Sequence, residues 1–212
     1  MAHPALLIAI EGVEGAGKST QATRLGRSLG AHVTREPGGT ALGEQVRRLL
    51  LDPASGDIDP RAELMLMLAA RAQHVAGRIL PALATGTHVV VDRFSGSTLA
   101  YQGYGRGLAV DEIIRACDFA AGGRWPDLNV LLDLDVAAGA ARRHDEEADR
   151  IEAADGAFHD RVRRGFLELA SSDPDTWAVI DASASPDEVA EHVLAAVTER
   201  MDLLGSGGRP KP

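Results

Sequence analysis

The residues with the clearest chemistry lie near the start of the sequence. The phosphate-binding pattern G-x-x-x-x-G-K-[ST] is matched by Gly12-Val13-Glu14-Gly15-Ala16-Gly17-Lys18-Ser19-Thr20. Glycines in such a loop let backbone N–H groups converge on phosphate oxygens, and a helix that begins there adds the positive end of its dipole. Lys18 would reach the β- and γ-phosphates, and the Ser19 hydroxyl would ligate Mg²⁺. These nine residues predict a site for ATP with magnesium; the alternative is a chance match.

The use of lysine supports the phosphate site. The chain has 20 arginines but only two lysines, Lys18 and Lys211. An ammonium is a compact point charge, whereas a guanidinium is a planar fork. Lysine is therefore kept at the position where the loop needs the compact charge.

Missing motifs narrow the class of nucleotide-binding protein. The guanine motif N-K-x-D of GTPases does not occur, and neither does the L-S-G-G-Q motif of ABC-type ATPases. Small kinases that phosphorylate a nucleotide or metabolite remain as the largest group.

The elements around the loop follow a repeated strand–helix order. Short apolar runs lie at 5–10, 32–34, 88–91, 129–132 and 177–180. Helical patterns lie between them at 18–29, 42–51, 60–83, 110–121, 136–144, 154–171 and 186–203. Runs such as Leu6-Leu7-Ile8-Ala9-Ile10 and Val89-Val90-Val91 do not alternate with polar residues, which is typical of strands buried on both sides; a short buried helix is the alternative. The order predicts an α/β fold of the P-loop NTPase type, with a parallel sheet between two layers of helices.

Length and composition set limits on organisation. The 212 residues are 45% hydrophobic, enough for one kinase-sized domain over 1–204 with a flexible, disordered tail at 205–212. The charged stretch 142–155 is either a solvated helix face or a mobile lid. The helical pattern at 60–83 is apolar all round near its middle, so it packs either in the centre of the domain or against a second copy of the chain, and a homodimer is favoured.

Charge and cysteine usage exclude several partners. The net charge of −9 argues against broad coating of nucleic acid, which needs a basic surface. Cys117 is the single cysteine, so no disulfide forms within the chain, as suits the cytoplasm. No apolar run approaches the roughly 20 residues that span a bilayer, so no membrane association is expected.

Three further segments carry a family resemblance. They are Thr34-Arg35-Glu36-Pro37-Gly38-Gly39-Thr40, then Asp92-Arg93-Phe94-Ser95-Gly96-Ser97-Thr98-Leu99-Ala100-Tyr101-Gln102-Gly103, and Asp149-Arg150-Ile151-Glu152. Together with the phosphate loop they resemble thymidylate kinase. The resemblance implies a five-stranded parallel sheet, a homodimer, and transfer of the ATP γ-phosphoryl group to dTMP, giving dTDP and ADP for dTTP biosynthesis. The alternatives are a kinase for another nucleoside or nucleotide on the same fold, or a non-catalytic ATP-binding protein.

The family that the chain resembles has two types, which differ in the position of the catalytic arginine. One type has a basic residue in the phosphate loop, where this chain has Glu14; the other supplies arginine from the lid. This chain resembles the bacterial lid-arginine type, with Arg142, Arg143 and Arg150 as candidates. The first two are adjacent and point about 100° apart on a helix, so only one of them would reach the γ-phosphate, and neither is preferred. Surface solvation is the alternative for each.

The acceptor phosphate has its own candidates. Arg93 follows Asp92 at the carboxyl end of a central strand, where open α/β sheets bind ligands, and its guanidinium can fork onto a phosphate. An ordinary Asp–Arg ion pair is the alternative. Arg35 is expected to contact the same phosphate, unless it only precedes a connecting turn. By resemblance, Asp92 and Glu152 join Ser19 as metal-site residues.

The resemblance assigns the acceptor's base and sugar as well. Arg71 would hydrogen-bond a pyrimidine carbonyl, and Thr98 and Gln102 would face the base from one side of a short helix. Tyr101 would crowd a 2′-hydroxyl, and Glu14 would approach the sugar or the metal's water shell. Met67 stands where the family usually stacks a phenylalanine on thymine. A methionine can cover a ring face through its polarizable sulfur.

Overall fold

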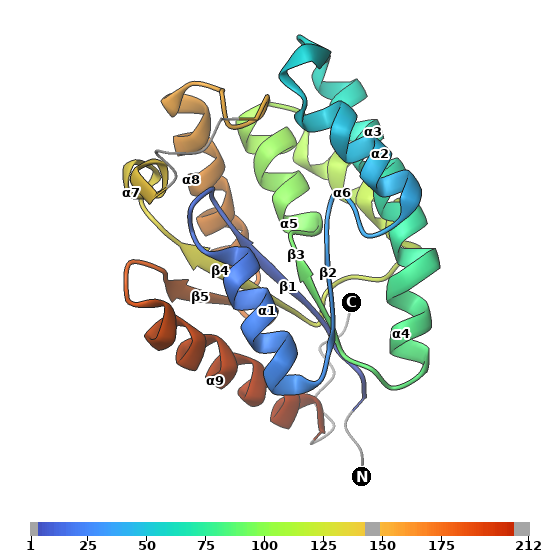
Figure 1. The fold of residues 1–212 in the computed structure, drawn as a ribbon, viewed down its shortest axis with the longest axis vertical. Helices are drawn as coiled ribbons and strands as arrows, with labels where there is room; N and C mark the ends of the chain where they lie inside the picture. The colour runs from blue at the N-terminus through green and yellow to red at the C-terminus, as the bar shows by residue number, and fades with distance from the viewer. Residues whose placement is uncertain (1–3, 143–148, 206–212) are drawn as a thin grey trace.

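A computed structural model describes residues 4–142 and 149–205 of the chain. Figure 1 shows a central sheet with helices on both sides. The five strands are β1 (Leu7–Gly12), β2 (His32–Arg35), β3 (Val89–Asp92), β4 (Leu128–Asp133) and β5 (Trp177–Asp181). All strand pairs are parallel, in the order β2-β3-β1-β4-β5. The five-stranded parallel sheet expected from the sequence is confirmed.

The strand order extends to both sides of the central strand β1, which pairs with β3 on one side and β4 on the other. In open parallel sheets the crevice at such a switch point, outside the carboxyl ends of the strands, is where ligands bind. The phosphate loop leaves β1 at this end. The fold therefore presents the predicted phosphate site at the edge of the sheet where a ligand can reach it.

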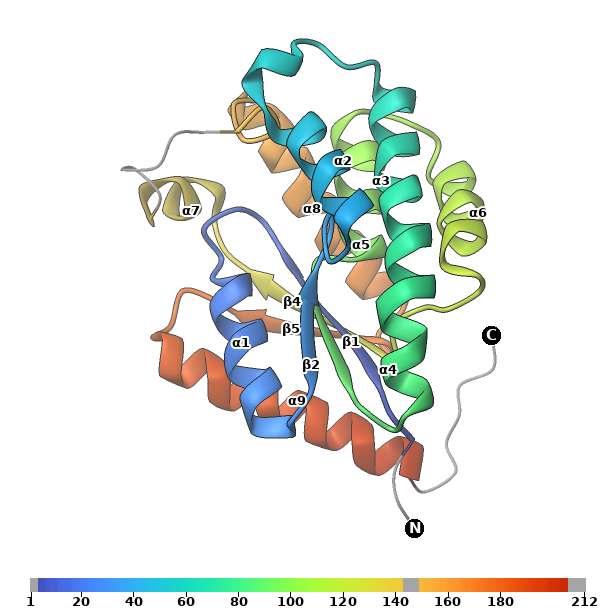
Figure 2. The same ribbon diagram turned by 45° about the vertical axis from the view of Figure 1, so that its right-hand side comes forward.

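The helices are α1 (Lys18–Leu29), α2 (Ala41–Leu51), α3 (Pro60–His74), α4 (Leu80–Ala84), α5 (Ser95–Thr98), α6 (Val110–Ala121), α7 (Val136–Arg142), α8 (Gly156–Ser172) and α9 (Pro186–Gly205). Two π-helical segments, η2 (Val75–Ile79) and η3 (Leu99–Gly105), and a 3₁₀ turn, η1 (Pro53–Ser55), complete the described elements. Figure 2 shows α3 between α2 and α6, and α9 lying along the lower part of the molecule.

The core has two sides because neighbouring residues of a strand point to opposite faces of the sheet. Leu7 and Ala9 of β1 belong to a cluster with Val75 and Ile79 of η2. Ile8 and Ile10 belong instead to the larger cluster that includes α1, α8 and α9. The three-layer arrangement follows from this alternation, since each face must be covered by helices.

The helical pattern predicted at 60–83 forms three consecutive pieces, α3, η2 and α4. Pro81 lacks an N–H, and its ring conflicts with the carbonyl four residues earlier in a regular helix. The wider π turns of η2 end two residues before Pro81 and contain Gly77, the residue whose carbonyl would meet the proline ring. The run continues in direction, so α3 remains a long scaffold for the side chains of the site.

Several expectations concern segments that the structure describes in part. Helix α9 ends at Gly205, one residue into the segment expected as a tail. Of the expected lid at 142–155, residues 143–148 lie outside the described residues, as do 206–212. Across 4–142 and 149–205, no helix is both long and apolar enough to cross a membrane.

Candidate active site

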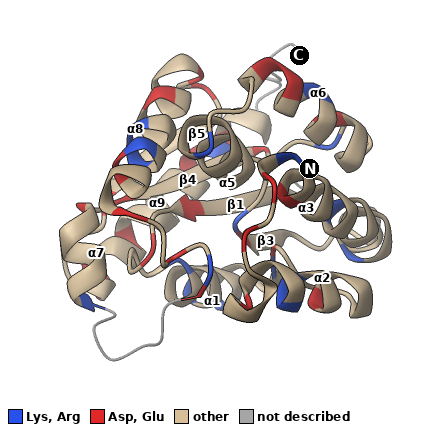
Figure 3. Cartoon of the chain, turned by 90° about the horizontal axis from the view of Figure 1, so that it is seen from above, with Lys and Arg blue, Asp and Glu red and all other residues tan. Residues whose placement is uncertain are grey.

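A cavity of about 130 Å³ opens at the carboxyl ends of the strands, and we call it the central cavity. It is lined by Glu14, Glu36, Pro37, Arg47, Leu51, Met67, Arg71, Arg93, Phe94, Ser97, Thr98, Tyr101, Gln102, Asp149, Ile151 and Glu152. These residues come from the phosphate loop, the turn after β2, helices α2 and α3, the segment from β3 through η3, and residues 149–152. Figure 3 looks onto this end of the molecule and shows acidic and basic positions on the segments around the sheet edge.

The phosphate loop is shaped by close backbone packing. Gly15 has a φ of +74°, and a side chain there would place its Cβ 2.3 Å from the carbonyl oxygen of Gly139 in α7. Only glycine fits both the conformation and the contact. Helix α1 then begins at Lys18 without a side-chain cap, so the N–H groups of its first turn remain available to an anion. The loop thus has the backbone shape that a phosphate cradle requires, and phosphate binding there stays a prediction.

Lys18 lies folded into this loop, with its Nζ donating to the carbonyl of Val13 at 2.6 Å. Burial and the nearby Arg93 lower the pKa of Lys18 to about 8, against the opposing effects of Glu14 and Asp92. The ammonium is thus held at the loop, and it loses its proton as the pH rises through about 8.

Ser19 and Asp92 form a second polar pair beside the loop. The Ser19 hydroxyl donates to Oδ2 of Asp92 at 2.5 Å, bringing a hydroxyl and a carboxylate oxygen together at the ends of neighbouring elements. Both are hard oxygen ligands of the kind that Mg²⁺ prefers. Within the described ranges, no group of three or more His, Cys, Asp or Glu residues could hold a metal. A magnesium ion here would therefore need phosphate oxygens and water to complete its shell.

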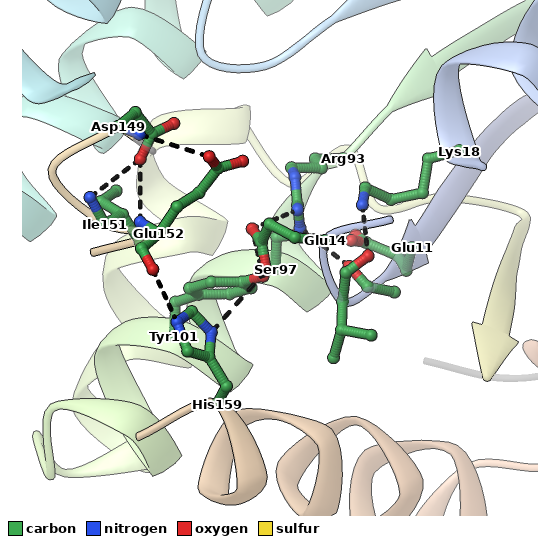
Figure 4. A network of polar contacts seen from close by, with 12 residues as sticks. Glu11, Glu14, Lys18, Arg93, Ser97, Tyr101, Asp149, Ile151, Glu152 and His159 are labelled. Carbon is green, nitrogen blue, oxygen red and sulfur yellow. Dashed lines mark hydrogen bonds and ion pairs between the residues drawn. The ribbon is translucent and has the colours of Figure 1, made fainter. Parts of the chain in front are cut away.

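Arg93 connects the phosphate loop to the central cavity (Figure 4). Its Nη2 donates to Glu14 at 2.7 Å, and its Nη1 donates to the Gly12 carbonyl at 3.0 Å and to Ser97 at 3.1 Å. Its φ of +69° is uncommon for a residue other than glycine. The surrounding contacts hold the guanidinium between the phosphate loop and the central cavity.

Glu14 is held as a carboxylate. Burial raises its pKa, but Arg93, Lys18 and the hydroxyl of Tyr101 outweigh burial and bring the pKa to about 2. The hydroxyl oxygen of Tyr101 lies 2.6 Å from both carboxylate oxygens. His159 approaches from α8, with Nδ1 3.9 Å from Glu14.

A buried carboxylate supports this arrangement from below. Glu11 of β1 accepts from the Phe94 N–H at 2.9 Å and from the Ser97 hydroxyl at 2.5 Å. Burial raises the pKa of Glu11. Its two bonds fix the turn in which Arg93 adopts its unusual backbone conformation. An acid at the end of an otherwise apolar strand was the available sequence signal for this role, which the sequence analysis missed.

The far end of the central cavity is built around Arg71, which is 2% exposed. Its Nε donates to Glu36 at 2.8 Å, its Nη2 to Thr98 at 2.9 Å, and its Nη1 to the Cys117 thiol at 3.2 Å. The guanidinium lies 4.8 Å from the centroid of the Phe94 ring. Arg71 is therefore rigidly held before any ligand binds.

The structure brings most of the expected acceptor residues together. Glu14, Met67, Arg71, Arg93, Thr98, Tyr101 and Gln102 all line the central cavity, and so does Glu152, which was expected at the metal site with Ser19 and Asp92. Arg35 lines a neighbouring cavity with Ser19 and Asp92, and it pairs with Glu44 at 3.0 Å. Glu152 is thus lined up with the central cavity rather than with the cavity of the Ser19–Asp92 pair.

The lid arginines lie in different places. Arg142 donates to the Ala182 carbonyl at 2.9 Å and lines a cavity on the outer side of the phosphate loop with Gly15 and Thr20. Arg150 donates to Glu63 at 2.5 Å and to the Leu50 carbonyl at 2.8 Å. Arg143 lies outside the described residues.

The structure adds cavity residues to which the sequence analysis gave no role. Arg47 of α2 lines the central cavity and donates to the Pro37 carbonyl at 3.1 Å, and burial lowers its pKa. Glu36 joins Arg71 to His74, whose Nδ1 lies 2.9 Å from it. Arg47 and Glu36 stand within or just after the R-E-P-G-G-T segment, which was the signal that could have singled them out.

Comparison with known proteins decides the family. The family model for thymidylate kinase matches residues 10–193. The chain belongs to the thymidylate kinase family. A thymidylate kinase of Solidesulfovibrio magneticus is 49% identical over 205 residues, covering 91% of this chain and 98% of that protein. A thymidylate kinase of Deinococcus radiodurans is 49% identical over 203 residues, covering 92% and 97%.

The fold agrees with a solved member of the thymidylate kinase family. The crystal structure of the thymidylate kinase from Ehrlichia chaffeensis superposes with a TM-score of 0.76 at 31% identity, covering 92% of this chain and 98% of that one. Both the family match and the fold support one reaction. The chain is a kinase that transfers the γ-phosphoryl group of ATP to dTMP.

Proposed function

We propose that ATP binds on the phosphate loop and dTMP in the central cavity, with Arg93 between them. The observation that carries this assignment is the position of Arg93, which lines the central cavity and contacts both Gly12 and Glu14 of the loop. A guanidinium in this place can fork onto the acceptor phosphate while it faces the donor phosphates. Phosphoryl transfer needs little more than in-line positioning and neutralised charge.

The donor side is assigned to the whole loop. Amides of Gly12–Thr20 and the Lys18 ammonium would hold the ATP phosphates. Mg²⁺, when bound with ATP, would neutralise the phosphate charge. Ser19 and Asp92 would supply its protein oxygens, and their 2.5 Å contact supports this pairing. Glu152 would act on the acceptor side, through the central cavity that it lines.

The charge that develops during transfer requires a further cation. Arg142 is supported by its contact with the Gly15 carbonyl at 3.4 Å, which places it at the phosphate loop. Arg143 follows it in the chain and stays an equal candidate. Arg150 is a catalytic candidate by resemblance, and its bonds to Glu63 and Leu50 suit it better to holding the roof of the central cavity.

The thymine base is assigned to the end of the central cavity lined by Met67, Arg71, Thr98 and Gln102. Arg71 would donate to a pyrimidine carbonyl, and Met67 would cover the ring face. Tyr101 would lie against the deoxyribose, where its ring crowds a 2′-hydroxyl. Arg35 would approach the dTMP phosphate from the neighbouring cavity that contains Ser19.

A homodimer through α3 is part of the proposal. Ala62, Met65, Ala69 and Ala72 are exposed in the single chain, and Met65 is 69% exposed. They lie three or four residues apart and form one apolar stripe along the helix. Helix α6 packs beside α3 and carries Phe119, which is 90% exposed. An open apolar face fits a second copy better than a helix buried at the domain centre. The proposed location remains the cytoplasm, in keeping with a single, reduced cysteine.

The experiment that tests the proposed function measures ADP release from Mg·ATP with dTMP, dUMP, dCMP, dAMP, dGMP, UMP and AMP in turn. We expect strong preference for dTMP, with UMP rejected through Tyr101. Equal use of all pyrimidine monophosphates would contradict the base assignment but leave the phosphate site intact. ADP release that does not depend on any acceptor would contradict the placement of dTMP in the central cavity.

A further inference from the structure

Glu63 of α3 is a buried carboxylate that does not line the central cavity. It is 0% exposed, yet four donors reach it. Gln102 donates through Nε2 to Oε1 at 2.9 Å, and Arg106 donates to both oxygens at 3.2 Å. Arg150 donates to Oε2 at 2.5 Å. One carboxylate therefore joins α3, the η3 segment and residues 149–152.

The charge state of Glu63 follows from these bonds. Burial raises its pKa, but the donors Gln102, Arg150 and Arg106 outweigh burial and leave the pKa below its ordinary value. An ionised carboxylate accepts hydrogen bonds and donates none. Two arginines hold it from different sides, so it cannot turn away from Gln102.

The orientation of the Gln102 amide is consequently fixed. A glutamine side chain has an NH₂ end that only donates and a carbonyl end that only accepts. The NH₂ end must face Glu63, because a carbonyl there would oppose a carboxylate. The carbonyl is then the end of Gln102 that remains for the central cavity, which this residue lines.

We infer that Glu63 is a positioning residue for base selection, because it presents the Gln102 carbonyl as a fixed acceptor to a pyrimidine ring. Such a site favours a base with an N–H at ring position 3, as in thymine, over cytosine, which has a lone pair there. With cytosine, two acceptors would face each other and one would stay unpaired, and unpaired buried polar groups are costly. The inference rests on the proposed placement of the base against Gln102.

The first test is Glu63→Gln, assayed for kcat/KM with dTMP and with dCMP. An amide at position 63 can offer either end to Gln102, so the Gln102 amide is free to turn its NH₂ end to the base. We expect the dTMP-to-dCMP ratio of kcat/KM to fall about tenfold, the share of one hydrogen bond, mainly through KM. An unchanged ratio in a folded variant would overturn the inference.

Two further variants separate positioning from general damage. Asp133→Asn also removes a carboxylate that pairs with an arginine through both oxygens, Arg163 at 2.8 and 3.1 Å, but away from the central cavity. Its ratio should equal that of the unmodified chain. If Glu63→Gln does not fold, Glu63→Asp decides, since it keeps the charge for the arginines but withdraws the carboxylate from Gln102. The ratio should fall there too, and a ratio that stays the same would overturn the inference.

A ligand probe distinguishes failure of this inference from failure of the base placement. Thymidine monophosphate methylated at N3 lacks the N–H donor. If the methylated nucleotide binds as tightly as dTMP, the placement of the base against Gln102 is wrong, and the inference about Glu63 is wrong with it. If the methylated nucleotide binds weakly while Glu63→Gln and Glu63→Asp both keep the ratio, the placement stands and Glu63 has no role in selection.

Discussion

The hydroxyl of Tyr101 lies 2.6 Å from both carboxylate oxygens of Glu14, which joins the η3 segment to the phosphate loop. The same carboxylate pairs with Arg93, whose guanidinium also lies 5.1 Å from the centroid of the Tyr101 ring. The three side chains form one unit between the phosphate loop and the central cavity. The position of Arg93 therefore depends both on Glu14 of the loop and on Tyr101 of the η3 segment.

Tyr101→Phe removes the hydroxyl and keeps the ring. We expect kcat with dTMP to fall several-fold, because Glu14 and Arg93 lose one constraint worth about 1 kcal/mol. Discrimination against UMP should persist, since the ring that would crowd a 2′-hydroxyl remains. Steady-state kinetics with both nucleotides tests this, and loss of UMP rejection would move the basis of sugar selection from the ring to the hydroxyl.

Arg93→Ala should lower kcat with dTMP by about a thousandfold or more, because the acceptor phosphate loses its charge partner in the transition state. ATP binding, measured by calorimetry without dTMP, should stay nearly intact because the loop amides and Lys18 remain. Arg163→Ala is the matched control, since it removes an arginine paired with Asp133 outside the central cavity. Turnover at the unmodified rate by Arg93→Ala would remove Arg93 from the mechanism.

The lowered pKa of Lys18 predicts an alkaline limit on ATP use. In the free enzyme Lys18 loses its proton above a pH of about 8, so kcat/KM for ATP should decline there. Lys18→Arg keeps its charge throughout this range and should show no such decline, although its activity is lower. The profile is measured at saturating dTMP from pH 6 to pH 10. The fall in kcat/KM should follow the loss of roughly one proton. A flat profile to the alkaline end would show that Lys18 stays charged.

Glu14 predicts a dependence of stability on acid. Its pKa in the folded chain is about 2, below its ordinary value of 4.5, so its contribution to stability is fully present above pH 4.5. The contribution is lost as the pH falls through the folded value, because the unfolded chain then binds the proton first. The difference in melting temperature between the unmodified chain and Glu14→Gln should therefore shrink between pH 5 and pH 2. A constant difference across that interval would contradict the ion pair with Arg93.

Met67→Phe tests whether a ring improves binding of the base. The residue lines the central cavity, and aromatic stacking adds about 0.5–1.5 kcal/mol beyond burial. We expect the KM for dTMP to fall a few-fold, with kcat unchanged. Met67→Leu is the control of similar volume without a ring, and it should leave KM near that of the unmodified chain. An increase of KM in Met67→Phe would mean that the cavity is too narrow for the ring.

Local sequence patterns were enough to predict the strands, helix α1 and the part of the central cavity that the 92–103 segment forms. Unbroken apolar runs correctly predicted the strands, and helix α1 begins and ends as expected. Residues of the 92–103 segment lie together because they follow one strand and one short helical run. Glu63 could not be found in this way. It is an acid in the first turn of a helix, a common and unremarked position, and its partners Gln102 and Arg150 are 39 and 87 residues away.

The same limit explains Arg35 and Arg47. Arg35 belongs to the segment 34–40 that resembles the family and Arg47 follows it in α2, yet sequence alone does not say which cavity each guanidinium reaches. The structure pairs Arg35 with Glu44 in the neighbouring cavity and leaves Arg47 at the Pro37 carbonyl in the central cavity. The hydrophobic periodicity also did not predict the π-helical turns of η2 and η3. Both depend on how the segment packs in the fold, and η2 also lies two residues before Pro81.

The buried thiol of Cys117 can be used to measure local opening of the structure. It is 0% exposed, burial raises its pKa, and it accepts a hydrogen bond from Arg71, which lines the central cavity. An alkylating reagent can reach it only when the packing around α6 opens, so the labelling rate measures how often that part of the molecule opens. Because the sequence contains a single cysteine, every labelled molecule records that one event. A nucleotide that contacts Arg71 should lower the rate at which Cys117 is alkylated, and a nucleotide that does not contact Arg71 should leave this rate unchanged.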